Sequence, residues 1–206
     1  MRSTIAFACV LAFAPALATS PAPATSAPFA CAERAANLGG IGRASVVAFV
    51  APINGGPVCA TVASLAIDSF TARVTETPAA DALVTAALTG GGDVTLPLEG
   101  ATLTGAGPYV VAPGGVFPSF GSDFSEAPRV IFAYAGGRVL VIGTTPVSLV
   151  DMTSTLRRNP ALFGTDAVER AIVIASGPAA VLSLQTSDGV FGDPVTTPRI
   201  LELRKR

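Results

Sequence analysis

The sequence predicts an α+β fold: a single domain built on a central mixed β-sheet with two or three helices. Short runs that are apolar without interruption, at residues 139–142 and 171–174, are typical of strands covered on both faces. Segments with a strand pattern outnumber segments with a helical pattern. Strands and helices also do not alternate regularly, as they would in an α/β protein.

The first predicted elements form a hairpin. Residues 45–51 are rich in β-branched and aromatic side chains, and they are followed by Asn54-Gly55, which is typical of a tight turn. Residues 58–76 alternate between apolar and polar side chains. This pattern predicts one strand, or two strands separated by a bend at 66–69.

Two segments have the pattern of a helix. Segment 77–92 begins with Thr-Pro, has an acid in its first turn, carries apolar side chains at helical spacing and ends in three glycines. Segment 145–160 also begins with Thr-Pro, and it ends with Asn-Pro. Its apolar stripe consists of Leu149, Met152 and Leu156, which we interpret as core residues.

The other segments are predicted strands. They cover residues 94–98, 109–112, 130–134, 139–143, 171–175, 179–185 and 200–203.

Composition limits the classes of function. The chain has 206 residues, of which 50% are hydrophobic and 13% charged, so it can bury a sizeable core as one domain. The net charge is −1, and the last three residues form the only basic run, so nucleic acid is not an expected partner. There is no histidine, which removes the usual imidazole base and metal ligand.

The first thirty residues predict export. Residues 1–18 combine a basic start with a short apolar run that ends in small residues, the pattern of a signal peptide cleaved after Ala18. Residues 19–30 are rich in proline, alanine and hydroxyl groups and predict an extended tether before a domain at 31–206. No further apolar run is long enough to span a membrane. We therefore expect an extracytoplasmic protein, periplasmic or secreted, without a transmembrane segment in the mature chain.

The cysteines agree with export. Cys9 would leave with the signal peptide, and Cys31 and Cys59 would remain as a pair predicted to form a disulfide. A lipidation site at Cys31 is less favoured because residues 28–30 do not form a lipobox. Two thiols without histidine are a poor metal site, so we expect no metal and no cofactor.

Residues 105–185 carry a series of motifs. They include Gly-Ala-Gly-Pro-Tyr-Val-Val at 105–111, Ala-Pro-Arg-Val-Ile-Phe-Ala-Tyr at 127–134 and Glu-Arg-Ala-Ile-Val-Ile-Ala-Ser-Gly-Pro at 169–178. In this order the motifs resemble the phosphodiester glycosidase family, whose bacterial members are often labelled exopolysaccharide-related. The resemblance implies the fold of that family and a carbohydrate or sugar-phosphate ligand.

Several residues match the family's motifs. The family's Gly-Pro pair corresponds to Gly107 and Pro108, and its strand-opening arginine corresponds to Arg129. Arginine is the natural bidentate ligand of phosphate, although Arg129 could also be a strand-edge residue paired with Glu126. The resemblance implies these candidate substrate-binding residues: Arg129, Gly107, Pro108, Ser176 and Gly177.

The last motif departs from the family. Val173 stands in place of its asparagine, Ala175 in place of its aspartate and Ser176 in place of its first glycine. Carboxylates usually act as the acid, base or nucleophile in glycoside hydrolysis, and alanine supplies none of these. Without histidine and without a Gly-x-Ser-x-Gly motif, Ser176 is not expected to be the nucleophile of a triad.

Three functions follow as hypotheses. The first is an exported phosphodiester-glycosidase-like protein with impaired or altered hydrolysis of glycosyl phosphodiesters. The second is a non-catalytic protein that binds a glycan or a partner through the same pocket. The third is a working enzyme with relocated acids, for which the candidates near Arg129 are Asp123, Glu126 and Asp151. The catalytic residues themselves are not predicted.

The glycine clusters at 39–42 and 90–92 lack a nucleotide-binding pattern and are interpreted as loops.

Overall fold

The structure is a computed structural model that describes residues 31–89, 93–95, 102–104, 107–115 and 124–206. Contacts divide the chain into two units, Met1–Ala30 and Cys31–Arg206, and the fold below is that of the second unit. The predicted signal peptide, the predicted tether and the glycines at 90–92 lie outside the described residues.

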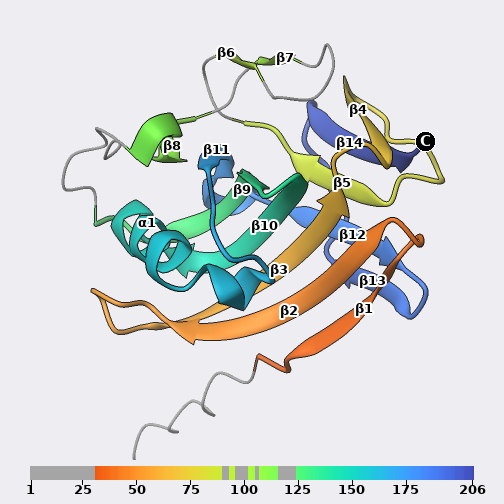
Figure 1. Ribbon diagram of the computed structural model, residues 1–206. Helices are drawn as coiled ribbons and strands as arrows, with labels where there is room; N and C mark the ends of the chain where they lie inside the picture. Colours follow the sequence, from red (N-terminus) through yellow and green to blue (C-terminus); the bar gives the residue numbers. More distant parts are fainter. Residues whose placement is uncertain (1–30, 90–92, 96–101, 105–106, 116–123) are drawn as a thin grey trace, which may run out of the picture. The chain divides into compact units, whose positions relative to one another are not determined.

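Two antiparallel sheets make up most of the described domain (Figure 1). The larger one, sheet A, has seven strands among the described residues. In spatial order they are β1 (Arg34–Leu38), β2 (Gly42–Val50), β3 (Pro57–Ala66), β10 (Arg138–Val147), β9 (Ala127–Ala135), β11 (Arg170–Ser176) and β8 (Tyr109–Val111).

Sheet B has five strands within the described part of the chain. In spatial order they are β13 (Gly189–Gly192), β12 (Leu182–Thr186), β5 (Val84–Ala87), β14 (Ile200–Lys205) and β4 (Phe70–Thr75). A separate pair consists of β6 (Asp93–Thr95) and β7 (Thr102–Thr104). The helical segments are α1 (Leu149–Arg158) and the 3-10 turns η1 (Pro113–Gly115), η2 (Pro160–Phe163) and η3 (Gly177–Ala179).

An apolar cluster, which we call the inter-sheet core, is built from side chains of both sheets. Leu65 and Val141 contribute from sheet A, and Val84, Leu184 and Leu203 contribute from sheet B. Each of these side chains is fully buried. Hydrophobic burial therefore holds the two sheets against each other.

A second cluster, the helix-side core, covers the other face of sheet A. Ile131, Leu140 and Ile142 of the sheet pack there with Met152 and Leu156 of α1. The central strands of sheet A are thus buried on both faces. This confirms the interpretation of the uninterrupted apolar run at 139–142, and of Met152 and Leu156 as core residues.

The predicted fold class is wrong. All strand pairs in the described residues are antiparallel, so the sheet is not mixed, and α1 is the single α-helix there. The domain is mostly β-structure in two sheets. No helix among the described residues is long and apolar enough to cross a membrane.

The helix predicted at 77–92 does not form in its described part. Residues 84–87 are instead β5, which pairs with β12 on one side and β14 on the other. Val84, Ala86 and Ala87 are fully buried in this central strand. Alanine has the highest helix propensity, but that preference amounts to less than about 1 kcal/mol per residue, and pairing on both edges of a buried strand outweighs it.

The second helix forms, but it begins later than predicted. Thr145 and Pro146 belong to β10, in a stretch where the pairing with β9 shifts register between Thr144 and Val147. Ser148 is the N-cap, and its Oγ accepts a hydrogen bond from the backbone N–H of Asp151 at 3.1 Å. The serine three residues further along therefore provides the cap that was assigned to threonine.

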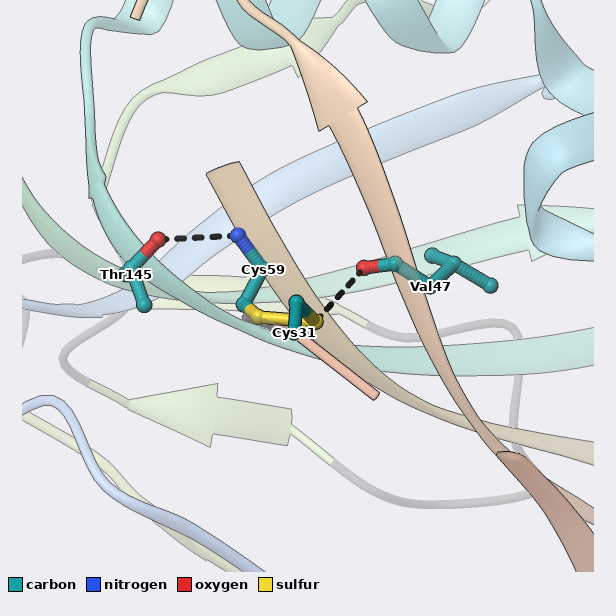
Figure 2. The surroundings of a disulfide bond; sticks show 4 residues. All are labelled: Cys31, Val47, Cys59 and Thr145. Carbon is teal, nitrogen blue, oxygen red and sulfur yellow. Dashed lines mark hydrogen bonds between the residues drawn. A yellow bond between two sulfur atoms is a disulfide. The ribbon is translucent and has the colours of Figure 1, made fainter. Parts of the chain in front are cut away.

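The predicted hairpin and disulfide are confirmed. Strands β2 and β3 pair antiparallel from Gly42 opposite Leu65 to Val50 opposite Pro57, and β4 follows β3 after a turn. Figure 2 shows the disulfide between Cys31 and Cys59, whose Cα atoms lie 5.8 Å apart. It fastens the start of the described domain to the inner strand β3. Strands β1, β7 and β13 were not predicted.

Candidate functional site

Arg129 lies in β9 at the point where three strands of sheet A meet. It is directly opposite Ser176 on β11 and Thr144 on β10. Directly opposite residues of antiparallel strands point to the same face, so these three side chains form one group. Only 7% of the surface of Arg129 is exposed, so the sheet buries this cation and polar atoms must surround it.

At least four hydrogen bonds to described residues hold Arg129. Its Nη1 donates to Ser176 Oγ at 2.8 Å, its Nη2 donates to the Ser125 carbonyl at 3.2 Å and its Nε donates to the Val147 carbonyl at 3.5 Å. Its backbone N–H donates to Thr144 Oγ1 at 3.3 Å. The guanidinium therefore links the end of β11, the end of β10 and the segment before β9. Much of its donor capacity is used within the protein.

Ser176 is the exposed member of this group. Its oxygen accepts from Arg129, so its hydroxyl hydrogen remains available as a donor. It is followed by Gly177, which begins η3 with a φ of 77°, a conformation that favours glycine. The structure thus brings the candidates Arg129, Ser176 and Gly177 together.

Ala175 lies on the opposite face of the sheet. It pairs with Val130, one position along from the pair of Arg129 and Ser176. Both Ala175 and Val130 have no exposed surface and belong to the inter-sheet core. The position that the family resemblance assigns to an aspartate is therefore surrounded by apolar side chains, and it points away from Arg129.

Gly107 and Pro108 lie along the other edge of β11. The Gly107 N–H donates to the Val173 carbonyl at 2.5 Å, and the Val173 N–H donates to the Pro108 carbonyl at 3.0 Å. A Cβ on Gly107 would lie 3.0 Å from the Val173 carbonyl oxygen, so the close approach explains the glycine. Strand β11 therefore separates these two candidates from Arg129.

The candidate acids have different environments. Asp151 is fully buried, and its carboxylate accepts from Ser148 Oγ at 2.7 Å and from the backbone N–H groups of Ile53 at 2.7 Å and Asn54 at 3.4 Å. It thereby ties the turn between β2 and β3 to the start of α1. The exposed Glu126 accepts from Asn54 Nδ2 at 3.1 Å. Asp123 lies outside the described residues.

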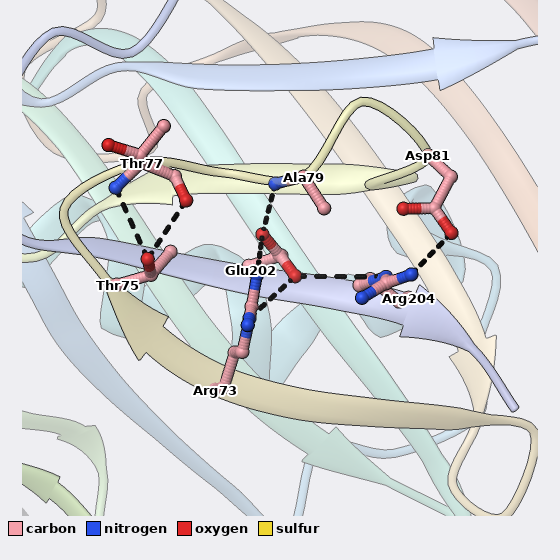
Figure 3. A network of polar contacts seen from close by, with 7 residues as sticks. All are labelled: Arg73, Thr75, Thr77, Ala79, Asp81, Glu202 and Arg204. Atoms are coloured by element: carbon pink, nitrogen blue, oxygen red, sulfur yellow. Dashed lines mark hydrogen bonds and ion pairs between the residues drawn. The ribbon is translucent and has the colours of Figure 1, made fainter.

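A buried carboxylate that the sequence analysis missed lies in sheet B (Figure 3). Glu202 has no exposed side-chain surface and accepts from Arg73 Nε at 2.9 Å and from the Ala79 N–H at 2.6 Å. Next to it, Arg204 donates to Asp81 at 2.5 Å. This hydrogen bond lowers the pKa of Asp81 and raises the pKa of Arg204. The network holds the 76–82 loop on sheet B, and no pattern in the sequence pointed to it.

Two cavities are lined by described residues. One, of about 420 Å³, lies between the β9–β10 turn and the segment after η2, and Arg138, Asp166 and Glu169 line it. The other, of about 210 Å³, lies between β3 and β10 of sheet A and β12 and β13 of sheet B. Neither cavity includes a candidate substrate-binding residue. Within the described residues no group of three or more side chains could hold a metal ion.

Comparison with known proteins supports the fold alone. No protein family matches the sequence, and no curated protein matches it in sequence. The structure is similar to the catalytic domain of zebrafish N-acetylglucosamine-1-phosphodiester alpha-N-acetylglucosaminidase, auto-inhibited by its pro-peptide, with a TM-score of 0.53. The match covers 84% of this chain and 88% of that chain at 10% identity. The chain therefore has a phosphodiester-glycosidase-like fold.

Proposed function

We propose that this chain is an exported protein that binds a carbohydrate or a sugar phosphate, and that its hydrolysis of glycosyl phosphodiesters is lost or altered. The observation that carries the proposal is the placement of Ala175. It is fully buried in the inter-sheet core, on the face of sheet A opposite Arg129. A carboxylate introduced there would point away from a ligand held at Arg129.

Among the described residues, the nearby acids do not replace the missing one. Glycoside hydrolysis uses a pair of carboxylates on either side of the scissile bond. Asp151 is buried and already accepts three hydrogen bonds, so its role is to join the β2–β3 turn to α1. Glu126 is exposed, but it supplies a single carboxylate.

The geometry around Ser176 supports binding. Its oxygen is engaged by Arg129, and its hydroxyl hydrogen can donate to an oxygen of a phosphate or a sugar. The adjacent guanidinium adds positive charge, which favours an anionic oxygen at this place. We assign Ser176 as the ligand contact and Arg129 as the residue that positions it.

Binding and turnover of defined compounds test the proposal. The probes are N-acetylglucosamine 1-phosphate for binding and its methyl phosphodiester for hydrolysis. We expect no turnover above buffer, and we expect Ser176→Ala to weaken binding of the monoester about tenfold or more, because a hydrogen bond to a charged group contributes about 1.5–3 kcal/mol.

The variant Arg138→Gln is the matched control. Arg138 is another arginine of sheet A; it lies at the start of β10, far from Arg129, and donates hydrogen bonds to Ser64 of β3. We expect it to bind the monoester as the parent does, and Arg129→Gln to bind more weakly. Turnover of the diester by the parent, abolished by Arg129→Ala, would overturn impaired hydrolysis and favour a working enzyme with relocated acids. Binding of a protein partner without binding of either probe would favour the second hypothesis, a non-catalytic partner-binding protein.

A further inference from the structure

We propose that the 210 Å³ cavity between the two sheets is a subsite for one uncharged sugar residue. The proposal rests on the proposed function only for the carbohydrate class of the ligand. It does not involve Ser176 or Arg129, the residues assigned to ligand binding in that function. The residues that the argument uses are Cys59, Thr61, Gly143, Thr145, Leu182 and Asp193, all of which line the cavity.

The cavity exists because the inter-sheet core ends before the sheets do. Ala63 on β3 and Val141 on β10 are paired, fully buried members of that core. The next pair on the same face is Thr61 and Gly143, and neither belongs to the core. A Cβ on Gly143 would lie 2.8 Å from the Cβ of Leu182, so the glycine permits β12 to approach. Beyond this contact the space between the sheets is left open.

Polar groups line the open space. Thr145 Oγ1 accepts a hydrogen bond from the Cys59 N–H at 2.9 Å, which leaves its hydroxyl hydrogen as a donor (Figure 2). The half-buried Thr61 hydroxyl and the exposed Asp193 carboxylate have no side-chain partner among the described residues. Every fully buried side-chain oxygen of the described residues has a hydrogen-bond partner. Because the Thr61 oxygen has none, it is not fully buried and is open to solvent. The cavity therefore offers hydroxyl donors and acceptors together with a carboxylate acceptor.

These groups favour a neutral ligand rich in hydroxyls. Among the described residues no lysine or arginine lines the cavity, and the Asp193 carboxylate would repel a phosphate. The volume equals that of about seven water molecules at ~30 Å³ each, which is below the roughly 300–1,000 Å³ of sites for drug-sized molecules. A sugar hydroxyl both donates and accepts, so a single sugar residue can engage Thr61, Thr145 and Asp193 at once.

Backbone amide shifts measured by NMR test this subsite. The probes are glucose, galactose, mannose and N-acetylglucosamine, each titrated into the disulfide-bonded mature chain. We expect at least one of them to produce saturable shifts at Thr61, Thr145 and Asp193. Asp193→Asn should weaken that sugar about tenfold or more, because its hydrogen bonds are to a charged group.

Controls separate this subsite from the Arg129 group. Asp188→Asn changes an exposed carboxylate in the β12–β13 turn and should leave the affinity for the sugar unchanged. Ser176→Ala should also leave it unchanged while weakening N-acetylglucosamine 1-phosphate. The proposal is overturned if none of the four sugars shifts the cavity amides, if the shifts map to Ser176 and Gly177, or if Asp193→Asn binds as the parent does. Loss of phosphate binding alone would instead count against the proposed function.

Discussion

Replacing Ala175 by aspartate should destabilise the protein rather than restore an active site. The side chain at this position has no exposed surface and faces the inter-sheet core with Val130 and Ile174. A carboxylate placed there leaves water for an apolar environment, where its charged form is strongly disfavoured. The same substitution is also the direct way to rebuild the family's aspartate. It therefore separates a position 175 that belongs to the core from a position 175 that belongs to an active site.

The cost has two parts. Burial raises the pKa of the introduced carboxyl in the folded state, so it folds in the protonated form. Protonating at pH 7 a group whose pKa is about 3.9 in the unfolded chain costs ~4 kcal/mol, at 1.36 kcal/mol for each pH unit. The added atoms cost about 1–3 kcal/mol more, because the core is already filled. The sum is comparable to the ~5–15 kcal/mol total stability of a typical domain.

Ala175→Asn isolates the electrostatic part, since it adds the same shape without an ionisable group. A raised folded-state pKa means that the folded protein binds more protons than the unfolded one, so stability falls as the pH rises. We therefore expect the aspartate and asparagine variants to unfold alike near pH 4 and to differ by about 4 kcal/mol at pH 7.

Urea unfolding followed by far-ultraviolet circular dichroism measures this difference, because the chain has no tryptophan to report on unfolding. Equal stability of the two variants at pH 7 would show that the introduced carboxyl reaches water. If Ala175→Asp also hydrolysed the methyl phosphodiester of N-acetylglucosamine 1-phosphate, the placement of this residue in the core would be wrong.

Further predictions concern the framework. Replacing both Cys31 and Cys59 by serine should lower the free energy of unfolding by about 3.5 kcal/mol, given their separation of 28 residues, and urea unfolding of both forms checks this. Glu202→Gln should lower the free energy of unfolding by about 2 kcal/mol, which is less than the loss of a fully buried ion pair because the partner Arg73 is 53% exposed. In the same assay Asp81→Asn, at the exposed end of the network, should have a smaller effect. N-terminal sequencing of the exported protein should begin at Thr19; a first residue far from it would contradict the predicted signal peptide.

The strands were predictable where burial on both faces leaves an uninterrupted apolar run. Residues 139–142 are such a run, and β10 forms there with neighbours above and below. The segment 84–87 was not predictable, because alanines at helical spacing also suit a central strand with partners on both edges. Those partners, β12 and β14, lie about 100 residues away along the chain, so no local pattern reveals them.

The candidate site was predictable only in part, for a similar reason. The approach of Arg129 to Ser176 follows from the register between β9 and β11, which the motifs do not specify. A single position along that register decides which face each side chain occupies. It places Ala175 in the core, although Ala175 and Ser176 are adjacent in the sequence. The role of Asp151 was equally hidden, since its partners Ile53 and Asn54 come from a distant turn.

Strand β10 connects the two proposed binding places through Thr144. Gly143, Thr144 and Thr145 all line the cavity between the sheets, and Thr144 Oγ1 also accepts the backbone hydrogen bond of Arg129 at 3.3 Å. Both places therefore depend on the same segment of β10, and neither depends on a carboxylate at position 175. Glycoside hydrolysis uses a positioned pair of acids, whereas the two proposed binding places use a hydroxyl beside an arginine and a cavity lined by hydroxyls and the Asp193 carboxylate. Both proposals therefore concern binding rather than turnover.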